Sequence, residues 1–128
     1  MFFNLLYVAI GGGLGAVGRY SLGLAFERVG GSGFSYSTMV ANIIGSFLMG
    51  LLVVWLLGKG EAAESYRLLL GVGLLGGFTT FSSFSLEAMN LLKQGMGPFL
   101  AYVLASVIIS LLAIAMGLYL GRQIWGVS

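Results

Sequence analysis

The chain has 128 residues, of which 59% are hydrophobic and 8% are charged, and its mean hydropathy is +1.03. Soluble domains carry charge on about a quarter of their residues, so this composition indicates a membrane protein. The absence of cysteine and histidine excludes disulfides and the commonest transition-metal ligands, and a net charge of +2 without a basic run gives no reason to expect a nucleic-acid partner.

Four segments of the chain are suited to crossing a bilayer, which takes about 20 predominantly apolar residues. Charged residues and glycine-rich breaks separate these segments, which cover about 2–26, 37–57, 65–92 and 98–123. A turn is expected at residues 30–33, and Pro98, a favoured first-turn residue, starts the fourth segment. The sequence therefore predicts an all-α membrane protein with four transmembrane helices in one domain, residues 1–128.

The first span contains Arg19, which is the one cation near the membrane interior. A charge inside a membrane is a functional-site hypothesis by default, and the alternative is that the side chain extends to the lipid headgroups. The first span also begins a series of glycine pairs with the spacing that lets helix backbones approach closely. These pairs predict tight helix contacts and assembly, and they are Gly11 and Gly15, Gly73 and Gly77, and Gly117 and Gly121.

Polar residues recur at every fourth position in two spans, a spacing that places them on one face of a helix. They are Thr38, Asn42 and Ser46 in the second span and Tyr102, Ser106 and Ser110 in the fourth. A single membrane hydroxyl usually bonds to its own helix, but an unpaired buried amide such as Asn42 costs on the order of 2–7 kcal/mol. Because the two stripes offer hydrogen-bond donors and no lysine or carboxylate, they predict a narrow polar path that favours an anion.

The third span contains GGFTTFSSFSLE at residues 76–87. Its glycines weaken a helix and its threonines and serines compete for backbone hydrogen bonds, so a break is expected at about residues 76–83. Non-helical backbone is tolerated at this depth where protein buries it or where it faces a polar cavity. The freed carbonyl groups would suit a hard cation.

Phenylalanines recur every three residues through the same segment, at Phe78, Phe81 and Phe84. In a plain helix such a stripe usually packs in the core or faces lipid. Beside the donor stripes, a second interpretation is open, because a phenyl ring has an electropositive edge. Rings presented edge-on can contact a small anion without holding it too tightly to leave.

The basic residues are nearly balanced between the two sides of the membrane. With four spans, Lys59, Arg67 and Arg122 lie on one side, whereas Arg28 and Lys93 lie on the other, joined by Arg19 if it extends outward. Because loop Lys and Arg residues set orientation, this balance predicts insertion in both orientations and permits an antiparallel homodimer. The alternative is a fixed topology that a partner or the insertion process imposes.

Three segments resemble the signature stretches of the CrcB/Fluc fluoride channels: GGGLGAVGRY at 11–20, STMVANIIGSFLMG at 37–50 and GGFTTFSSFSLE at 76–87. They occur in the expected order and spacing, and the resemblance covers essentially the whole chain. It implies a passive, fluoride-selective channel that expels fluoride across a prokaryotic plasma membrane. It also implies an antiparallel homodimer with two pores, a broken third helix and a structural sodium ion at the dimer interface.

The resemblance also assigns roles to individual residues. Phe81, Phe84 and Asn42 would face the pore, while Thr38, Tyr102, Ser106 and Ser110 would form its polar track, to which the stripe in the second span adds Ser46. Glu87 would lie near the end of the track and Arg19 in a charged vestibule. The main-chain carbonyls of Gly76 and Thr79 would bind the sodium ion.

Other functions fit the sequence less well. A small dual-topology, proton-coupled exporter of hydrophobic cations would need a carboxylate deep in a span, and Glu87 lies late in the third. An enzyme is not expected, because the chain lacks His, Cys and clustered acids that could act as acid, base or metal ligands. A purely structural subunit would leave Asn42 and the broken span unexplained.

Overall fold

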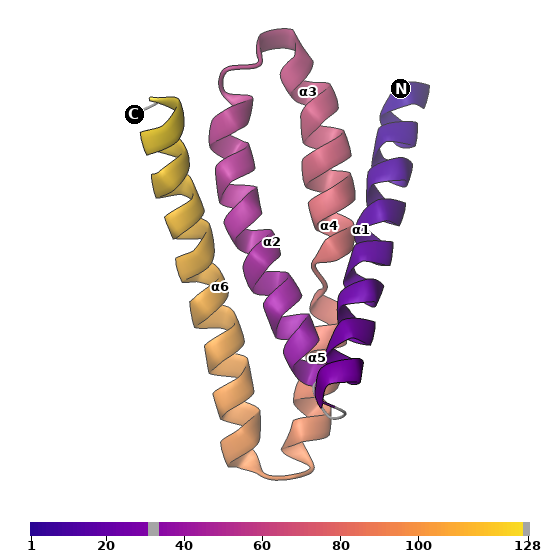
Figure 1. Ribbon diagram of the computed structural model, residues 1–128, viewed down its shortest axis with the longest axis vertical. Helices are drawn as coiled ribbons and strands as arrows, with labels where there is room; N and C mark the ends of the chain where they lie inside the picture. The colour runs from indigo at the N-terminus through magenta and orange to yellow at the C-terminus, as the bar shows by residue number, and fades with distance from the viewer. Residues whose placement is uncertain (31–33, 127–128) are drawn as a thin grey trace.

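The structure is a computed structural model that describes residues 1–30 and 34–126 (Figure 1). In these residues four helical segments are long and apolar enough to cross a membrane, and they are Phe2–Val29, Tyr36–Leu56, Gly60–Leu92 and Met96–Trp125. The described residues contain no strand, so the prediction of an all-α protein with four spanning segments is confirmed. Most of the turn expected at residues 30–33 lies outside the described residues.

Three of the spans are single helices and the third is a composite. The single helices are α1 (Phe2–Gly30), α2 (Phe34–Leu56) and α6 (Met96–Trp125). The third span consists of the 3-10 helix η1 (Gly60–Ala62), α3 (Ala63–Tyr66), the π-helix η2 (Arg67–Leu75), α4 (Gly76–Phe78) and α5 (Phe81–Leu92). Both ends of the chain and the connection from α2 to η1 lie at one end of the molecule in Figure 1, as an even number of spans requires.

Helix α1 packs on η2 and α4 through the first two glycine pairs. A Cβ atom built on Gly15 would overlap the carbonyl oxygen of Leu74 and would lie 2.7 Å from the amide nitrogen of Phe78. A Cβ atom on Gly77 would lie 2.5 Å from the carbonyl oxygen of Gly12. The two backbones are thus in direct contact, and a side chain on either helix would separate them.

Helix α2 packs on α6 through Gly117, which lies against backbone atoms of α2, and through Gly121, which lies against the side chain of Val54. A Cβ atom on Gly117 would overlap the carbonyl oxygen of Phe47 and would lie 3.1 Å from the Cα atom of Gly50. The glycine pairs therefore form close helix contacts, as predicted, but these contacts lie within one subunit. They join α1 to the third span and α2 to α6.

The π-helix η2 was not anticipated. In its wide turns a backbone N–H bonds to the carbonyl five residues earlier, as the amide of Gly76 does to Gly71. Residues five apart therefore lie on the same side of this segment. Consistent with this, backbone atoms of both Leu69 and Leu74 lie against Gly11 of α1.

The third span is broken at Thr79 and Thr80, whose backbones are extended (φ −85°, ψ 157° and φ −153°, ψ 126°). This break is shorter than the predicted range of 76–83. Gly76 and Gly77 remain helical, and α5 resumes at Phe81 because the Thr80 side chain accepts a hydrogen bond from the Ser83 amide. The two threonines form the break. Gly77 does not, and its close contact with Gly12 of α1 is the reason that a glycine is needed at this position.

We predict that Gly15→Ala destabilises the fold, whereas Gly13→Ala does not. The two glycines lie on the same helix, but a Cβ on Gly13 meets nothing within 4 Å. Overpacking against backbone costs about 1–3 kcal/mol, whereas an unopposed Gly→Ala change in a helix gains up to about 1 kcal/mol. Thermal unfolding in detergent, followed by circular dichroism, measures both variants, and equal melting temperatures would contradict the packing described above.

Candidate functional site

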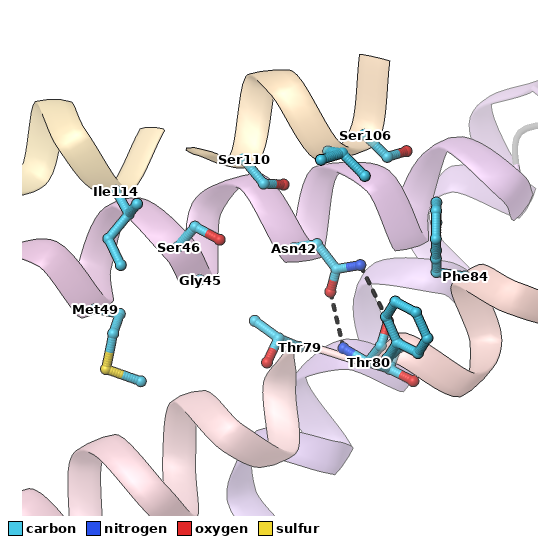
Figure 2. A pocket seen from close by; sticks show the side chains of 12 residues that line it. Asn42, Gly45, Ser46, Met49, Thr79, Thr80, Phe84, Ser106, Ser110 and Ile114 are labelled. Atoms are coloured by element: carbon cyan, nitrogen blue, oxygen red, sulfur yellow. Dashed lines mark hydrogen bonds between the residues drawn. The ribbon is translucent and has the colours of Figure 1, made fainter. Parts of the chain in front are cut away.

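The third-span break, α2, α5 and α6 line an open cavity of about 340 Å³ (Figure 2). Its lining is polar where the two helical stripes face the break and apolar toward Met49 and Ile114. The lining residues are Asn42, Gly45, Ser46, Met49, Thr79, Thr80, Phe81, Phe84, Ser106, Val107, Ser110 and Ile114. No charged side chain contributes to this lining among the described residues.

The cavity gathers most of the site residues predicted from sequence. Those that line it are Asn42, Ser46, Thr79, Phe81, Phe84, Ser106 and Ser110. Residues that the sequence analysis did not assign to the site include Gly45, Met49 and Ile114. Helical spacing would have identified them, because Gly45 and Met49 follow Asn42 by three and seven residues and Ile114 follows Ser110 by four.

The Asn42 side chain binds the break on both of its polar atoms. Its Nδ2 donates to the carbonyl oxygen of Thr80 at 3.1 Å, and its Oδ1 accepts from the amide of Thr80 at 2.8 Å (Figure 2). These two hydrogen bonds satisfy both backbone groups of Thr80, whose backbone is extended. Since an amide nitrogen carries two hydrogens, Asn42 keeps one further N–H donor.

The serines of the two stripes do not bond to their own helices. Within the described part of the chain, the hydroxyls of Ser46, Ser106 and Ser110 make no hydrogen bond, and the Oγ of Ser106 is fully buried. By contrast, Ser85 donates to the carbonyl of Phe81 one turn earlier. The structural role that a lone membrane serine usually has is therefore absent at these three positions.

The aromatic residues form a stack that runs from the cavity into the core. The ring of Phe84 lies 5.5 Å from those of both Phe81 and Tyr102, and it is nearly parallel to the Tyr102 ring, with an interplanar angle of 21°. Phe84 is buried, whereas Phe81 is 77% exposed in the single subunit. The cavity is thus closed at Phe84 and open at Phe81.

Thr38, Glu87 and Tyr102 form a separate buried cluster beyond Phe84. The Thr38 hydroxyl donates to Oε1 of Glu87 at 2.9 Å, and the Tyr102 hydroxyl donates to Oε2 at 2.7 Å. These three residues were predicted on or near the polar track, but none of them lines the cavity. Each carboxyl oxygen has its own donor, so this cluster satisfies a buried acid within one subunit.

Arg19 and Gly76 also lie outside the cavity lining. Arg19 is half-buried, and its Nε donates to the carbonyl oxygen of Gly77 at 3.4 Å. That carbonyl belongs to the last turn of α4, where helix carbonyls lack backbone partners and a cation is favourable. The Arg19 side chain therefore turns toward the break in the third span.

The site offers hydrogen-bond donors and aromatic rings and little else chemically. No group of three or more His, Cys, Asp or Glu side chains that could hold a metal ion occurs in residues 1–30 and 34–126. Its hydroxyls have no neighbouring base that could activate them, because no charged or imidazole side chain lines the cavity in the described residues. Such a lining can bind an ion transiently but has no means of covalent chemistry.

Comparison with known proteins agrees with the resemblance seen in the sequence. The family described as "CrcB-like protein, Camphor Resistance (CrcB)" matches residues 6–118. A protein of Phenylobacterium zucineum is 50% identical over 123 residues, which cover 94% of this chain and 97% of the relative. A protein of Caulobacter vibrioides strain NA1000 is 46% identical over 124 residues, which cover 95% and 98%.

A third relative, from Caulobacter sp. strain K31, is 49% identical over 126 residues, which cover 97% of this chain and 98% of the relative. All three relatives carry the name "Fluoride-specific ion channel FluC". Both the family match and these identities extend over nearly the whole chain, including all three signature segments. The chain belongs to the CrcB family.

Proposed function

We propose that this protein is a passive, fluoride-selective channel. The observation that carries the proposal is the cavity lined by three hydroxyls without partners, those of Ser46, Ser106 and Ser110, in surroundings without charged side chains. A small anion loses hydration on entering, and neutral donors replace part of it without binding too tightly for release. The names of the relatives support fluoride as the ion.

Phe81 and Phe84 would supply the aromatic contacts of the path. Tyr102 covers one face of Phe84, and the Phe84 ring lines the cavity. The edge of a phenyl ring carries partial positive charge and can therefore face fluoride. With the second N–H of Asn42, the ring edges and serine hydroxyls complete a set of weak, neutral ligands.

A second subunit would complete the path. Phe81 is 77% exposed and the cavity opens beside it, although the ring belongs to the proposed ion path. An antiparallel copy that covers this side would enclose the rings of both chains and form two equivalent pores. The nearly even distribution of basic residues between the two ends supports insertion in both orientations.

A structural sodium ion would bind at the break. The carbonyl groups of Gly76, in the last turn of α4, and of Thr79, in the break, lie where the span leaves its helix, whereas the carbonyl oxygens of Leu75, Gly77 and Thr80 accept hydrogen bonds. Neutral main-chain oxygens are suitable ligands for an alkali cation, so these residues fit the ion. When bound, sodium would offset the partial negative charge of the two carbonyls and hold the broken span in shape.

The remaining predicted residues would act at the ends of the path. The cluster of Thr38, Glu87 and Tyr102 would form the far end of the polar track, and Arg19 would contribute positive charge to a vestibule. In the plasma membrane of a prokaryote, two such pores would let fluoride leave the cell down its electrochemical gradient.

A proton-coupled exporter of hydrophobic cations is the second candidate, and one observation favours it. Glu87 is a buried carboxyl group in a membrane-spanning helix, and such groups often carry protons in transporters. However, both of its oxygens accept hydrogen bonds within the subunit, and it does not line the cavity. The channel is therefore the better supported function.

We predict that liposomes containing the purified protein release fluoride without a proton gradient. Passive conduction requires only the gradient of the ion, so a protonophore together with a potassium ionophore should leave fluoride efflux intact. A fluoride-selective electrode measures the release, and chloride efflux measured in parallel should be slower by at least about tenfold because the narrow site suits the smaller ion. Strict dependence on a proton gradient would support the exporter.

Replacing the ring edges should impair conduction. We expect Phe81→Ile and Phe84→Ile each to lower fluoride efflux by about tenfold, because an interaction worth about 1–2 kcal/mol is lost from the path. Phe3→Ile is the matched control, since Phe3 is 67% exposed and lies outside the cavity. Size-exclusion chromatography should show that all three variants keep the assembly state of the wild type. Unchanged efflux in both cavity variants would mean that the rings do not contact the ion.

Single cysteines can determine the topology, because the natural chain has none. Gly58→Cys and Gln94→Cys place exposed thiols in turns on opposite sides of the expected membrane. Dual insertion predicts that an impermeant thiol reagent added outside intact cells labels about half of each variant. A fixed topology would give complete labelling of one variant and none of the other.

A further inference from the structure

Gly45 of α2 lies directly against the break in the third span. It is buried, it lines the cavity, and it lies one turn beyond Asn42 on the same face of the helix (Figure 2). A Cβ atom built on Gly45 would overlap Cγ2 of Thr79 and would lie 3.6 Å from Cδ2 of Phe78. The absence of a side chain at this position is therefore what allows Thr79 to approach α2.

The Thr79 side chain cannot easily turn away from this contact. Its Oγ1 donates to the carbonyl oxygen of Leu75 at 2.9 Å, and its amide donates to the same oxygen at 3.0 Å. A β-branched side chain whose hydroxyl is held in this manner has its methyl group fixed as well. A side chain at position 45 would therefore displace the backbone of the break together with the Thr79 side chain, because that side chain cannot rotate away by itself.

The next residue shows what such a displacement would disturb. Thr80 is bound to Asn42 by hydrogen bonds of 2.8 and 3.1 Å, and Asn42 lies three residues before Gly45 on the same helix. The contact between Gly45 and Thr79 and the two hydrogen bonds between Asn42 and Thr80 therefore fix the same distance, that between α2 and the break. That spacing is the distance across the cavity from Asn42 and Ser46 to Thr79 and Thr80 (Figure 2).

We propose that Gly45 is a positioning residue that determines the bore of the conducting site and hence its selectivity. The inference rests on the proposed channel function. Even one added methyl group would force the break away from α2, lengthen the bonds between Asn42 and Thr80, and widen the cavity. A wider site fits fluoride less closely and excludes chloride less well.

Gly45 differs from the packing glycines in a way that makes the proposal testable. Gly15 and Gly117 oppose backbone atoms, which no substitution removes, but the atom nearest a Cβ at position 45 is a side-chain methyl group. Thr79→Ser deletes that methyl group and keeps the hydroxyl that bonds to Leu75. A second substitution can therefore relieve the overlap that the first creates.

The experiment is a double-mutant cycle with Gly45→Ala, Thr79→Ser and the double variant, assayed in liposomes for fluoride and chloride efflux. In the wild-type background, Gly45→Ala should lower the ratio of fluoride to chloride efflux by about tenfold, a coupling typical of residues in contact. In the Thr79→Ser background, the same change should have little effect. Gly13→Ala, which adds a methyl group in open space, is the control and should keep the wild-type ratio.

Two results would overturn the proposal: a wild-type ratio in Gly45→Ala, or the same loss from Gly45→Ala in both backgrounds. Circular dichroism and size-exclusion chromatography establish that each variant is folded. If Gly45→Ala alone does not fold, the double variant decides by comparison with Thr79→Ser, because the two should have the same ratio of fluoride to chloride efflux, and a lower ratio in the folded double variant would contradict the inference. Failure of the wild type itself to release fluoride would instead count against the channel function.

Discussion

A backbone group that leaves its helix inside a bilayer has no water to bind, and this constraint shapes the third span of the protein. At Thr80 both backbone groups find their partners on one side chain, that of Asn42, and Thr80 caps the helix that follows. Arg19 binds a terminal carbonyl of the helix that precedes the break. The break is stabilised because α1 and α2 supply hydrogen bonds to Gly77 and Thr80 that the third span does not make itself.

The same constraint explains why the cavity lies where it does. Asn42 must face the break to satisfy it, and the periodicity of α2 then places Gly45, Ser46 and Met49 beside it on the same face. The backbone contact between Gly50 and Gly117 brings α6 close enough for its serines to face this stripe. Polar donors gather around the break as a consequence of helix spacing and glycine packing.

Much of this arrangement could be read from the sequence, because helices have a fixed period. Composition and periodicity identified four spans and two polar stripes. The glycines, threonines and serines of residues 76–83 indicated a break, although only Thr79 and Thr80 form it. The π-helix was not foreseen, since it is coupled to contacts with α1 that lie far away in sequence. Two further features join residues that are far apart in the sequence, so no pattern along the chain predicts them. They are the contact between Gly50 and Gly117 and the hydrogen bonds that Thr38 and Tyr102 donate to Glu87.

The buried carboxyl group of Glu87 bears directly on how a neutral path can serve an anion. A carboxylate near such a path repels fluoride, and the hydrogen bonds that Thr38 and Tyr102 donate to its two oxygens stabilise that charge without removing it. These two hydroxyls are thereby committed to Glu87 and are less available to a passing ion. Among the described residues that line the cavity, the hydroxyls of Ser46, Ser106 and Ser110 and one N–H of Asn42 are donors without a partner. Selectivity would then depend on how closely these few groups can surround the ion, which makes the spacing between α2 and the break more important than the number of polar residues.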